Sequence, residues 1–169
     1  MKILALDSSG LVASVAVVEN DTLLAEYTVN YKKTHSQTLL PMLDEISNMT
    51  ELDLSTIDAI AVAGGPGSFT GLRIGSATAK GLGLALEKPL ISIPTTAAIA
   101  YNIWDTDKFV CPIMDARRNQ VYTGVYCYTD HRLDTVWEQD TMSIEALAEG
   151  LNCLDHEVIF LGDGVAVYR

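Results

Sequence analysis

The first part of the chain consists of short hydrophobic runs separated by turn-forming residues. Three runs have the composition and alternation of β-strands: Ile3 to Asp7, Val12 to Val18 and Thr22 to Val29. Ser8-Ser9-Gly10 and Asn20-Asp21 supply the turns between them. Because these connections are too short for a crossover, we expect the three strands to form an antiparallel meander.

Helical spacing follows the three strands. Apolar residues recur three and four positions apart at Leu39, Leu40, Leu43 and Ile46. This spacing predicts a helix from Thr34 to about Asn48, with Thr34 as its N-cap and a bend at Pro41.

The run Ile57 to Ala63, which is continuously apolar after Asp58, predicts a strand covered on both faces. It leads into a glycine-rich loop and then into a helix from about Gly71 to Leu86. Pro89 to Ile93 predicts a further buried strand, and Thr95 to Ile103 a short helix capped by a threonine.

The pattern starts again after Asp107. It predicts three strands, at Phe109 to Asp115, Val121 to Tyr128 and Leu133 to Glu138. A helix from Ser143 to Leu151 and a last strand from Val158 to Leu161 follow. Three strands followed by alternating helix and strand, begun twice, is the layout of ribonuclease H-like and actin-like lobes. We therefore predict an α/β protein with lobes at 1–107 and 108–169, each a mixed sheet flanked by helices, the second lobe being incomplete.

Composition narrows the classes of function. With 169 residues, 49% of them hydrophobic, the chain can bury a real core but is short for two independent domains. Its 11 basic and 22 acidic residues give a net charge of −11, which disfavours capture of a nucleic acid by this chain alone. No leader sequence or membrane-length apolar run is visible, so we expect a cytoplasmic protein without a membrane partner.

Two loops are candidates for phosphate binding. Asp7-Ser8-Ser9-Gly10 joins two hairpin strands, and its amides and hydroxyls suit either a phosphate or an ordinary turn. The loop from Gly64 to Gly71, which includes Gly65 and Gly67, allows close approach of a ligand or of another backbone segment. It delivers the chain to a helix N-terminus, a natural anion site, but matches neither a Walker A nor a dinucleotide motif.

The helix after this loop has few bulky side chains. Glycines at Gly75, Gly81 and Gly83 cost about 1 kcal/mol each relative to alanine, so tight packing within the lobe or against a partner must offset them. Arg73 could bridge to a partner's carboxylate or pair with a local acid such as Asp58.

Catalytic groups are not evident in the sequence. The scattered cysteines and histidines suggest neither a disulfide framework nor a metal site, and no serine stands in a nucleophile elbow. Asp115-Ala116-Arg117-Arg118 is expected at a hairpin, as a surface turn or as a docking contact.

Four segments together resemble the TsaB (YeaZ) family: residues 1–9, Thr34-His35-Ser36, Gly65 to Gly75 and Asp115 to Arg118. The run Gly-Pro-Gly-Ser-Phe-Thr-Gly-Leu-Arg is the most specific. The resemblance implies an actin-like ATPase fold and a non-catalytic role beside TsaD, which transfers threonylcarbamoyl onto a tRNA adenosine. TsaE, a small ATPase, joins the assembly, so tRNA is reached only through the complex.

Catalysis does not carry over with the resemblance. TsaD holds a metal on a His-x-x-x-His helix, and the matching stretch here, Pro94 to Ala100, has neither histidine. We expect no required cofactor, with an ATP or ADP contact at a subunit interface left open at Asp7, Ser8, Ser9, Gly65 and Gly67.

The family's helical face implies how the subunits meet. The two helices of the first lobe would pair with TsaD or with a second copy of this chain. The contact residues expected there are His35, Leu39, Leu40, Met42, Leu43, Leu72, Arg73, Gly75, Ser76, Ala79, Lys80 and Gly83.

Two other readings compete with this one. An autonomous actin-like nucleotide enzyme would need a second glycine-rich phosphate hairpin, whereas Asp115 to Gln120 contains no glycine. A metalloprotease or sialoglycoprotease would need a metal that the sequence has no obvious means to bind.

Overall fold

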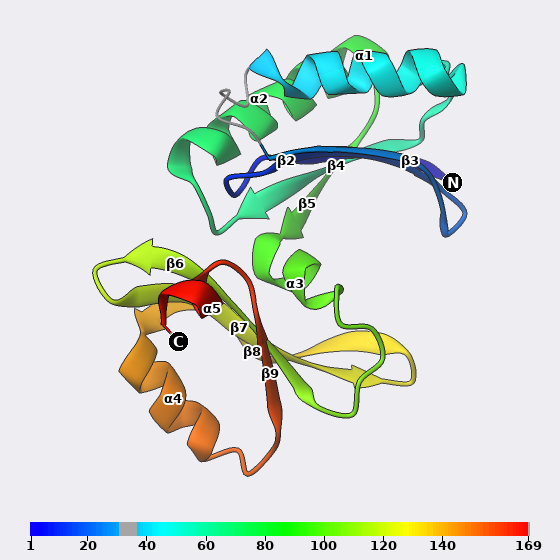
Figure 1. Cartoon of the computed structure of the whole chain (residues 1–169). Coiled ribbons are helices and arrows are strands. Elements are labelled where there is room, and N and C mark those ends of the chain that lie inside the picture. Colours follow the sequence, from blue (N-terminus) through cyan, green and yellow to red (C-terminus); the bar gives the residue numbers. More distant parts are fainter. Residues whose placement is uncertain (31–36, 169) are drawn as a thin grey trace. The chain divides into compact units, whose positions relative to one another are not determined.

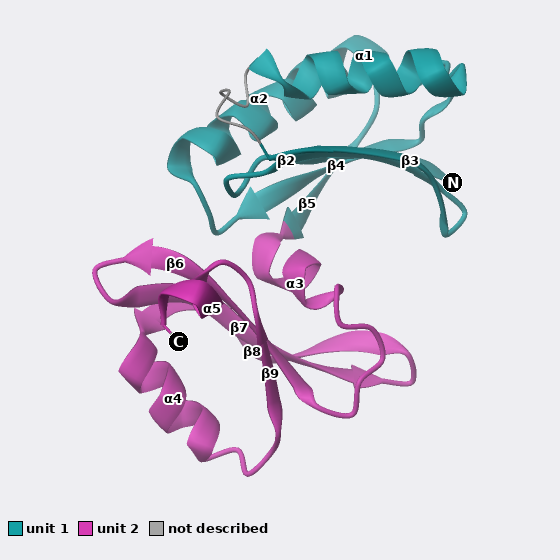
Figure 2. Cartoon of the chain, viewed as in Figure 1, with its two compact units in different colours: residues 1–93 teal, residues 94–169 magenta. Residues whose placement is uncertain are grey.

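The computed structural model describes residues 1–30 and 37–168 (Figure 1). The chain forms two compact units, residues 1–93 and 94–169 (Figure 2). This division differs from the expected lobes at 1–107 and 108–169. Helix α3 (Thr95–Ala100) packs against strands of the second unit and therefore belongs to that unit, so the boundary lies before α3.

Unit 1 is built on a five-stranded mixed sheet. Its strands are β1 (Lys2–Asp7), β2 (Ala13–Glu19), β3 (Thr22–Val29), β4 (Ala59–Gly65) and β5 (Leu90–Pro94), in the order β3-β2-β1-β4-β5. β1 pairs antiparallel with β2 and parallel with β4, so that Ala5 lies between Ala16 and Ala61. The predicted meander of β1, β2 and β3 is confirmed.

The helices α1 (Leu39–Thr50) and α2 (Phe69–Leu86) lie on the same side of this sheet (Figure 1). Alternate sheet residues meet them in one hydrophobic core, with Leu4 and Val15 fully buried. The short helix η2 (Leu54–Thr56) leads into β4, whose residues are mostly buried, as predicted.

Three local predictions need revision. Helix α1 begins at Leu39 with Thr38 as N-cap, whereas the predicted cap, Thr34, lies outside the described residues. Pro41 lies in the first turn, where a backbone N–H has no intrahelical partner, so the reason for a bend disappears. β5 is an exposed edge strand rather than a buried one, because β4 is its sole neighbour in the sheet among the described residues.

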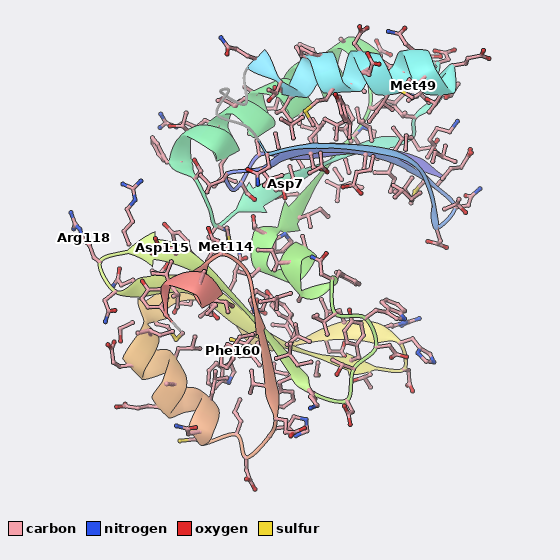
Figure 3. All side chains as sticks on the ribbon, in the orientation of Figure 1. Asp7, Met49, Met114, Asp115, Arg118 and Phe160 are labelled. Atoms are coloured by element: carbon pink, nitrogen blue, oxygen red, sulfur yellow. The ribbon has the colours of Figure 1, made fainter. Side chains whose placement is uncertain are left out.

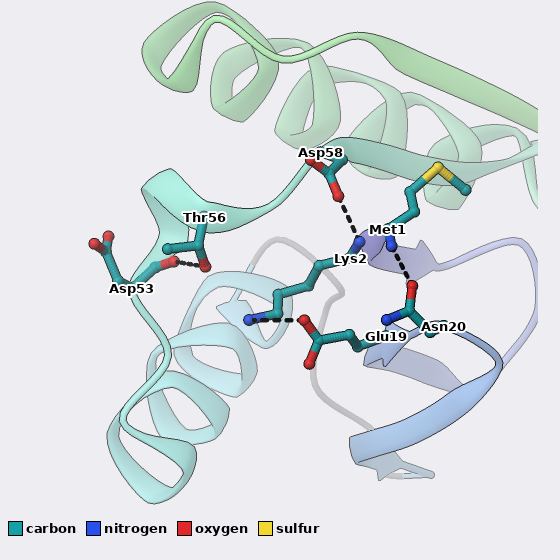
Figure 4. A network of polar contacts seen from close by, with 7 residues as sticks. All are labelled: Met1, Lys2, Glu19, Asn20, Asp53, Thr56 and Asp58. Carbon is teal, nitrogen blue, oxygen red and sulfur yellow. Dashed lines mark hydrogen bonds and ion pairs between the residues drawn. The ribbon is translucent and has the colours of Figure 1, made fainter.

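Polar contacts fix the start of β1 (Figure 4). The Lys2 amide donates to Asp58 Oδ2 at 2.6 Å, and Lys2 Nζ lies 3.6 Å from Glu19 Oε1. The amino group of Met1 donates to the Asn20 side chain. These contacts tie β1 to the β2–β3 turn and to the segment before β4.

Unit 2 repeats the arrangement on a smaller scale. Its strands are β6 (Phe109–Arg117), β7 (Gln120–Thr129), β8 (Arg132–Ser143) and β9 (Val158–Leu161), in the order β8-β7-β6-β9. β6 is antiparallel to β7 and parallel to β9, as β1 is to β2 and β4. The topology begun twice is therefore confirmed, and with it the α/β actin-like fold class.

The helices of unit 2 follow the predictions with two corrections. α4 (Ile144–Asn152) is capped by Ser143, whose hydroxyl accepts from the Ala146 amide at 3.1 Å. α3 ends earlier than predicted, and its N-cap is Pro94, while Thr95 is the first helical residue. The short helix α5 (Gly164–Val167) was not predicted, because four residues carry too little periodicity.

Candidate functional site

The two candidate phosphate loops of unit 1 are in direct contact. The Ser68 amide donates to the Ser9 carbonyl at 2.6 Å, which joins the glycine-rich loop to the β1–β2 turn. Gly67 has φ +154°, and a Cβ there would lie 2.4 Å from the Ser9 oxygen. Glycine is therefore needed at position 67 for the close approach of another backbone segment. The sequence had left open whether a ligand or a backbone segment would approach this loop.

Side chains of the first loop are engaged within the fold. Ser8 is buried, and its hydroxyl donates to the Gly71 carbonyl at 2.9 Å. Asp7, at the end of β1 (Figure 3), accepts from the Ser9 amide at 2.7 Å. The loop thus has the internal hydrogen bonds of an Asx-type turn, and the Ser8 hydroxyl is committed to the start of α2.

Helix α2 uses its glycines inside unit 1. Its buried residues recur every fourth position at Gly71, Gly75, Ala79 and Gly83. A Cβ on Gly75 would lie 2.5 Å from Ser8 Oγ, and one on Gly83 would lie 2.8 Å from Leu90 Cδ2. Packing of the helix against its own sheet therefore offsets the low helix propensity of glycine at these buried positions.

Burial corrects the predicted contact set. Leu39, Met42, Leu43, Gly75, Ala79 and Gly83 are buried in unit 1 and are not on its surface. Leu72 and Ser76 are half-buried, whereas Leu40, Arg73 and Lys80 are exposed. His35 lies outside the described residues. The helical periodicity was read correctly, but the apolar stripe of α1 faces the protein's own core.

An exposed stripe runs along the opposite side of α2. We call Phe69, Arg73, Ala77, Lys80, Gly81 and Leu84 the outer stripe. Phe69 is 69% and Leu84 83% exposed, and nothing lies within 4 Å of a Cβ placed on Gly81. Phe69 and Leu84 were not among the predicted contact residues, although their spacing from Arg73 and Lys80 is helical.

Arg73 has a different partner from the acid considered for it. Its guanidinium stacks over the Phe69 ring, with Cζ 3.9 Å from the ring centroid. Asp58 instead accepts a hydrogen bond from the Lys2 amide. The outer stripe therefore presents cations and apolar carbons side by side.

In unit 2, a threonine pair begins helix α3, within the stretch Pro94 to Ala100 that lacks histidines. Thr95 and Thr96 are both buried at the start of α3. Thr96 Oγ1 lies 2.7 Å from the Tyr126 hydroxyl and 3.1 Å from Gln139 Oε1, which ties α3 to β7 and β8. Among residues 1–30 and 37–168, no group of three His, Cys, Asp or Glu side chains is placed to hold a metal ion.

Replacing Tyr126 by phenylalanine should lower the free energy of unfolding by about 1 kcal/mol, because Thr96 loses a buried hydrogen bond. Tyr128→Phe is the matched control, since the Tyr128 hydroxyl has no hydrogen-bond partner in the described part of the chain. Urea denaturation of both variants measures the difference. Equal stabilities of the two variants would contradict a stabilising role for the Thr96–Tyr126 contact.

The β6–β7 hairpin carries Asp115 to Arg118 at an exposed turn (Figure 3). Arg117, Arg118 and Asn119 all have positive φ, a conformation that costs energy in residues with a Cβ. Asp115 Oδ1 accepts from the Arg117 amide at 2.8 Å, and Asn119 donates to Glu145 Oε1 at 2.6 Å. These bonds hold the turn and leave both arginines on the surface.

The repeated mixed-sheet topology defines this chain as a two-lobed protein of actin-like fold. The family model described as TsaD, tRNA N6-adenosine threonylcarbamoyltransferase, matches residues 22–169. The tRNA threonylcarbamoyladenosine biosynthesis protein TsaB of Bacillus subtilis (strain 168) is 36% identical over 169 residues, which are 100% of this chain and 74% of that protein. TsaB of Escherichia coli (strain K12) is 32% identical, over 97% of this chain and 72% of the relative.

A solved structure agrees with these relatives. YeaZ from Pseudomonas aeruginosa superposes with a TM-score of 0.77 at 31% identity, over 85% of this chain and 68% of that one. The chain belongs to the TsaB family, whose named members are biosynthesis proteins of tRNA threonylcarbamoyladenosine. Within the described residues, no helix has the length and apolar character needed to cross a membrane.

Proposed function

We propose that this chain is a non-catalytic scaffold subunit of bacterial tRNA threonylcarbamoyladenosine synthesis in the cytoplasm. It dimerises through unit 1 with TsaD or with a second copy of itself, and TsaE joins that assembly. The observation that carries the proposal is the outer stripe of α2, which leaves Phe69 and Leu84 exposed beside Arg73 and Lys80. Exposed aromatic and arginine side chains are enriched where proteins associate.

Neighbouring features support this surface as the docking face. Leu40, 52% exposed on α1, adds a further apolar side chain on the helical side of the sheet. Ala77 and Gly81 leave little bulk along the stripe, so a partner helix can approach α2 closely. The net charge of −11 supports contact with tRNA through the complex rather than through this chain.

The experiment is sizing by light scattering of the chain alone and with its cognate TsaD. Leu84→Asp should weaken the complex about tenfold, because a carboxylate would be desolvated in an apolar contact. Leu23→Asp on β3, the same change at a leucine that is 55% exposed, is the matched control and should leave the complex intact. Absence of a complex between the wild-type chain and TsaD would overturn the proposal.

The proposal requires no bound cofactor. Asp7, Ser8, Ser9, Gly65 and Gly67 stay predicted contacts for ATP or ADP at a subunit interface, and either nucleotide added to the sizing experiment tests them. Hydrolysis of ATP by the isolated chain would favour the alternative, an autonomous actin-like enzyme. Peptide hydrolysis that depends on an added metal would favour the metalloprotease reading.

A further inference from the structure

Three aromatic side chains gather at the surface of unit 2. We call Tyr101, Trp104 and Tyr128 the aromatic patch. The Tyr128 ring centroid lies 5.4 Å from that of Trp104 and 6.4 Å from that of Tyr101, both in edge-to-face geometry. Trp104 is 60% and Tyr101 53% exposed, so core packing does not account for these two large side chains.

A carboxylate lies beside the patch. Asp105 follows Trp104, and its Oδ2 atom is 2.6 Å from Nδ1 of His131 in the β7–β8 turn. Within the described residues, Oδ1 of Asp105 accepts no hydrogen bond. Burial of the hydroxyl, Tyr101 and then the Asp105 carboxylate raise the pKa of Tyr128. The Tyr128 hydroxyl is buried and has no partner in the described part of the chain.

The charges around the patch favour a cation. Its two segments, residues 101–108 and 128–134, carry Asp105, Asp107, Asp130 and Asp134 against Lys108 and Arg132. Lys108 is further neutralised by Glu157, 2.8 Å away. An acidic surface repels the phosphates of a nucleic acid, whereas aromatic ring faces beside a free carboxylate oxygen attract a positive charge.

We propose that the aromatic patch and Asp105 form a docking site for an arginine side chain of a protein partner. Arginine fits better than lysine, because its planar guanidinium can stack on a ring while it donates to a carboxylate. The chain already contains one such stack, Arg73 over Phe69. The site is on unit 2 and does not depend on the outer stripe of α2 or on the function proposed for it.

Fluorescence of Trp104 tests the site directly. The chain has two tryptophans, so Trp137→Phe leaves Trp104 as the reporter in the full chain. The probe is the peptide acetyl-Gly-Arg-Gly-Arg-Gly-amide, and its citrulline version is the neutral control. We expect saturable quenching by the arginine peptide and at least about fivefold weaker binding of the citrulline peptide.

Charge variants separate this site from general attraction to an acidic protein. Asp105→Asn should weaken arginine-peptide binding about fivefold, and asparagine tolerates the positive φ of 52° at this position. Glu149→Gln removes the same charge from the exposed surface of α4 and should leave binding unchanged. Tyr101→Leu should also weaken binding.

Several results would overturn the proposal. They are no quenching by the arginine peptide, equal quenching by the citrulline peptide, and equal effects of the Asp105 and Glu149 variants. Tighter binding of a short single-stranded RNA than of the arginine peptide would identify the patch as a base-stacking surface instead. Circular dichroism of each variant confirms that it is folded.

Discussion

Gly67→Ala is expected to lower the free energy of unfolding by about 3 kcal/mol or more. The new Cβ would lie 2.4 Å from the Ser9 carbonyl oxygen, a backbone atom that no rotamer change can move away. Displacing the Ser9 oxygen breaks its hydrogen bond from the Ser68 amide, which costs about 1 kcal/mol of stability. The φ of +154° adds strain for any residue with a Cβ. Overpacking supplies about 1–3 kcal/mol more.

Gly10→Ala is the control for this prediction. Gly10 belongs to the facing loop, and a Cβ there meets no atom within 4 Å. Its substitution should change stability by less than about 0.5 kcal/mol. Chemical denaturation of both variants measures the contrast, and similar losses at positions 10 and 67 would show that the two loops are not packed as described. The packing also bears on the proposed nucleotide contact, because Asp7 and Gly65 belong to the two loops that it joins.

A rise in pH from 8 to 11 should destabilise the chain through Cys111. Burial raises the pKa of this thiol to about 11, from an ordinary value of 9.0, and the Thr123 hydroxyl partly opposes the shift. Below pH 9 the thiol is protonated in both the folded and the unfolded states. Between pH 9 and 11 the unfolded chain releases the proton and the folded chain retains it, so the unfolding free energy falls.

The magnitude of this loss follows from the size of the shift. Two pKa units correspond to about 2.7 kcal/mol at most, since one unit is about 1.36 kcal/mol. Cys111→Ala removes this contribution and keeps the alkaline effects of the tyrosines. Urea denaturation of both proteins under reducing conditions should show their stability difference narrowing by about 2 kcal/mol as the pH rises from 8 to 11. Parallel stability curves would contradict a buried, protonated thiol at position 111.

Local sequence signals were sufficient for most of the fold. The alternation of β1, β2 and β3, the apolar run of β4 and the helical spacing of α1 each have a short-range physical cause. The four strands were predicted near their observed bounds, whereas α1 begins later than predicted. Exceptions arise where the environment decides. β5 has the composition of a buried strand but lies at a sheet edge, and β8 extends to Ser143, well beyond its predicted end.

The candidate site was less predictable, because a surface depends on which side of an element meets the core. Glycines on α2 predicted close packing correctly without identifying the neighbour, and the structure assigns Gly75 and Gly83 to the sheet of unit 1. The loss of Leu39 and Met42 from the predicted contact set has the same cause. Periodicity shows that a stripe exists, but it does not show what the stripe faces.

The sequence by itself determined the class of this protein: two mixed-sheet lobes, a glycine-rich turn before α2 and the motif run of the TsaB family. These features follow from short-range propensity and from residues that are adjacent along the chain. Tertiary structure alone decided that Ser8 is bonded to Gly71, that Phe69 and Leu84 are exposed, and that Tyr101, Trp104 and Tyr128 gather in one patch. The physical reason is that hydrogen bonds and ring contacts between distant segments depend on how the elements pack, which no local pattern encodes.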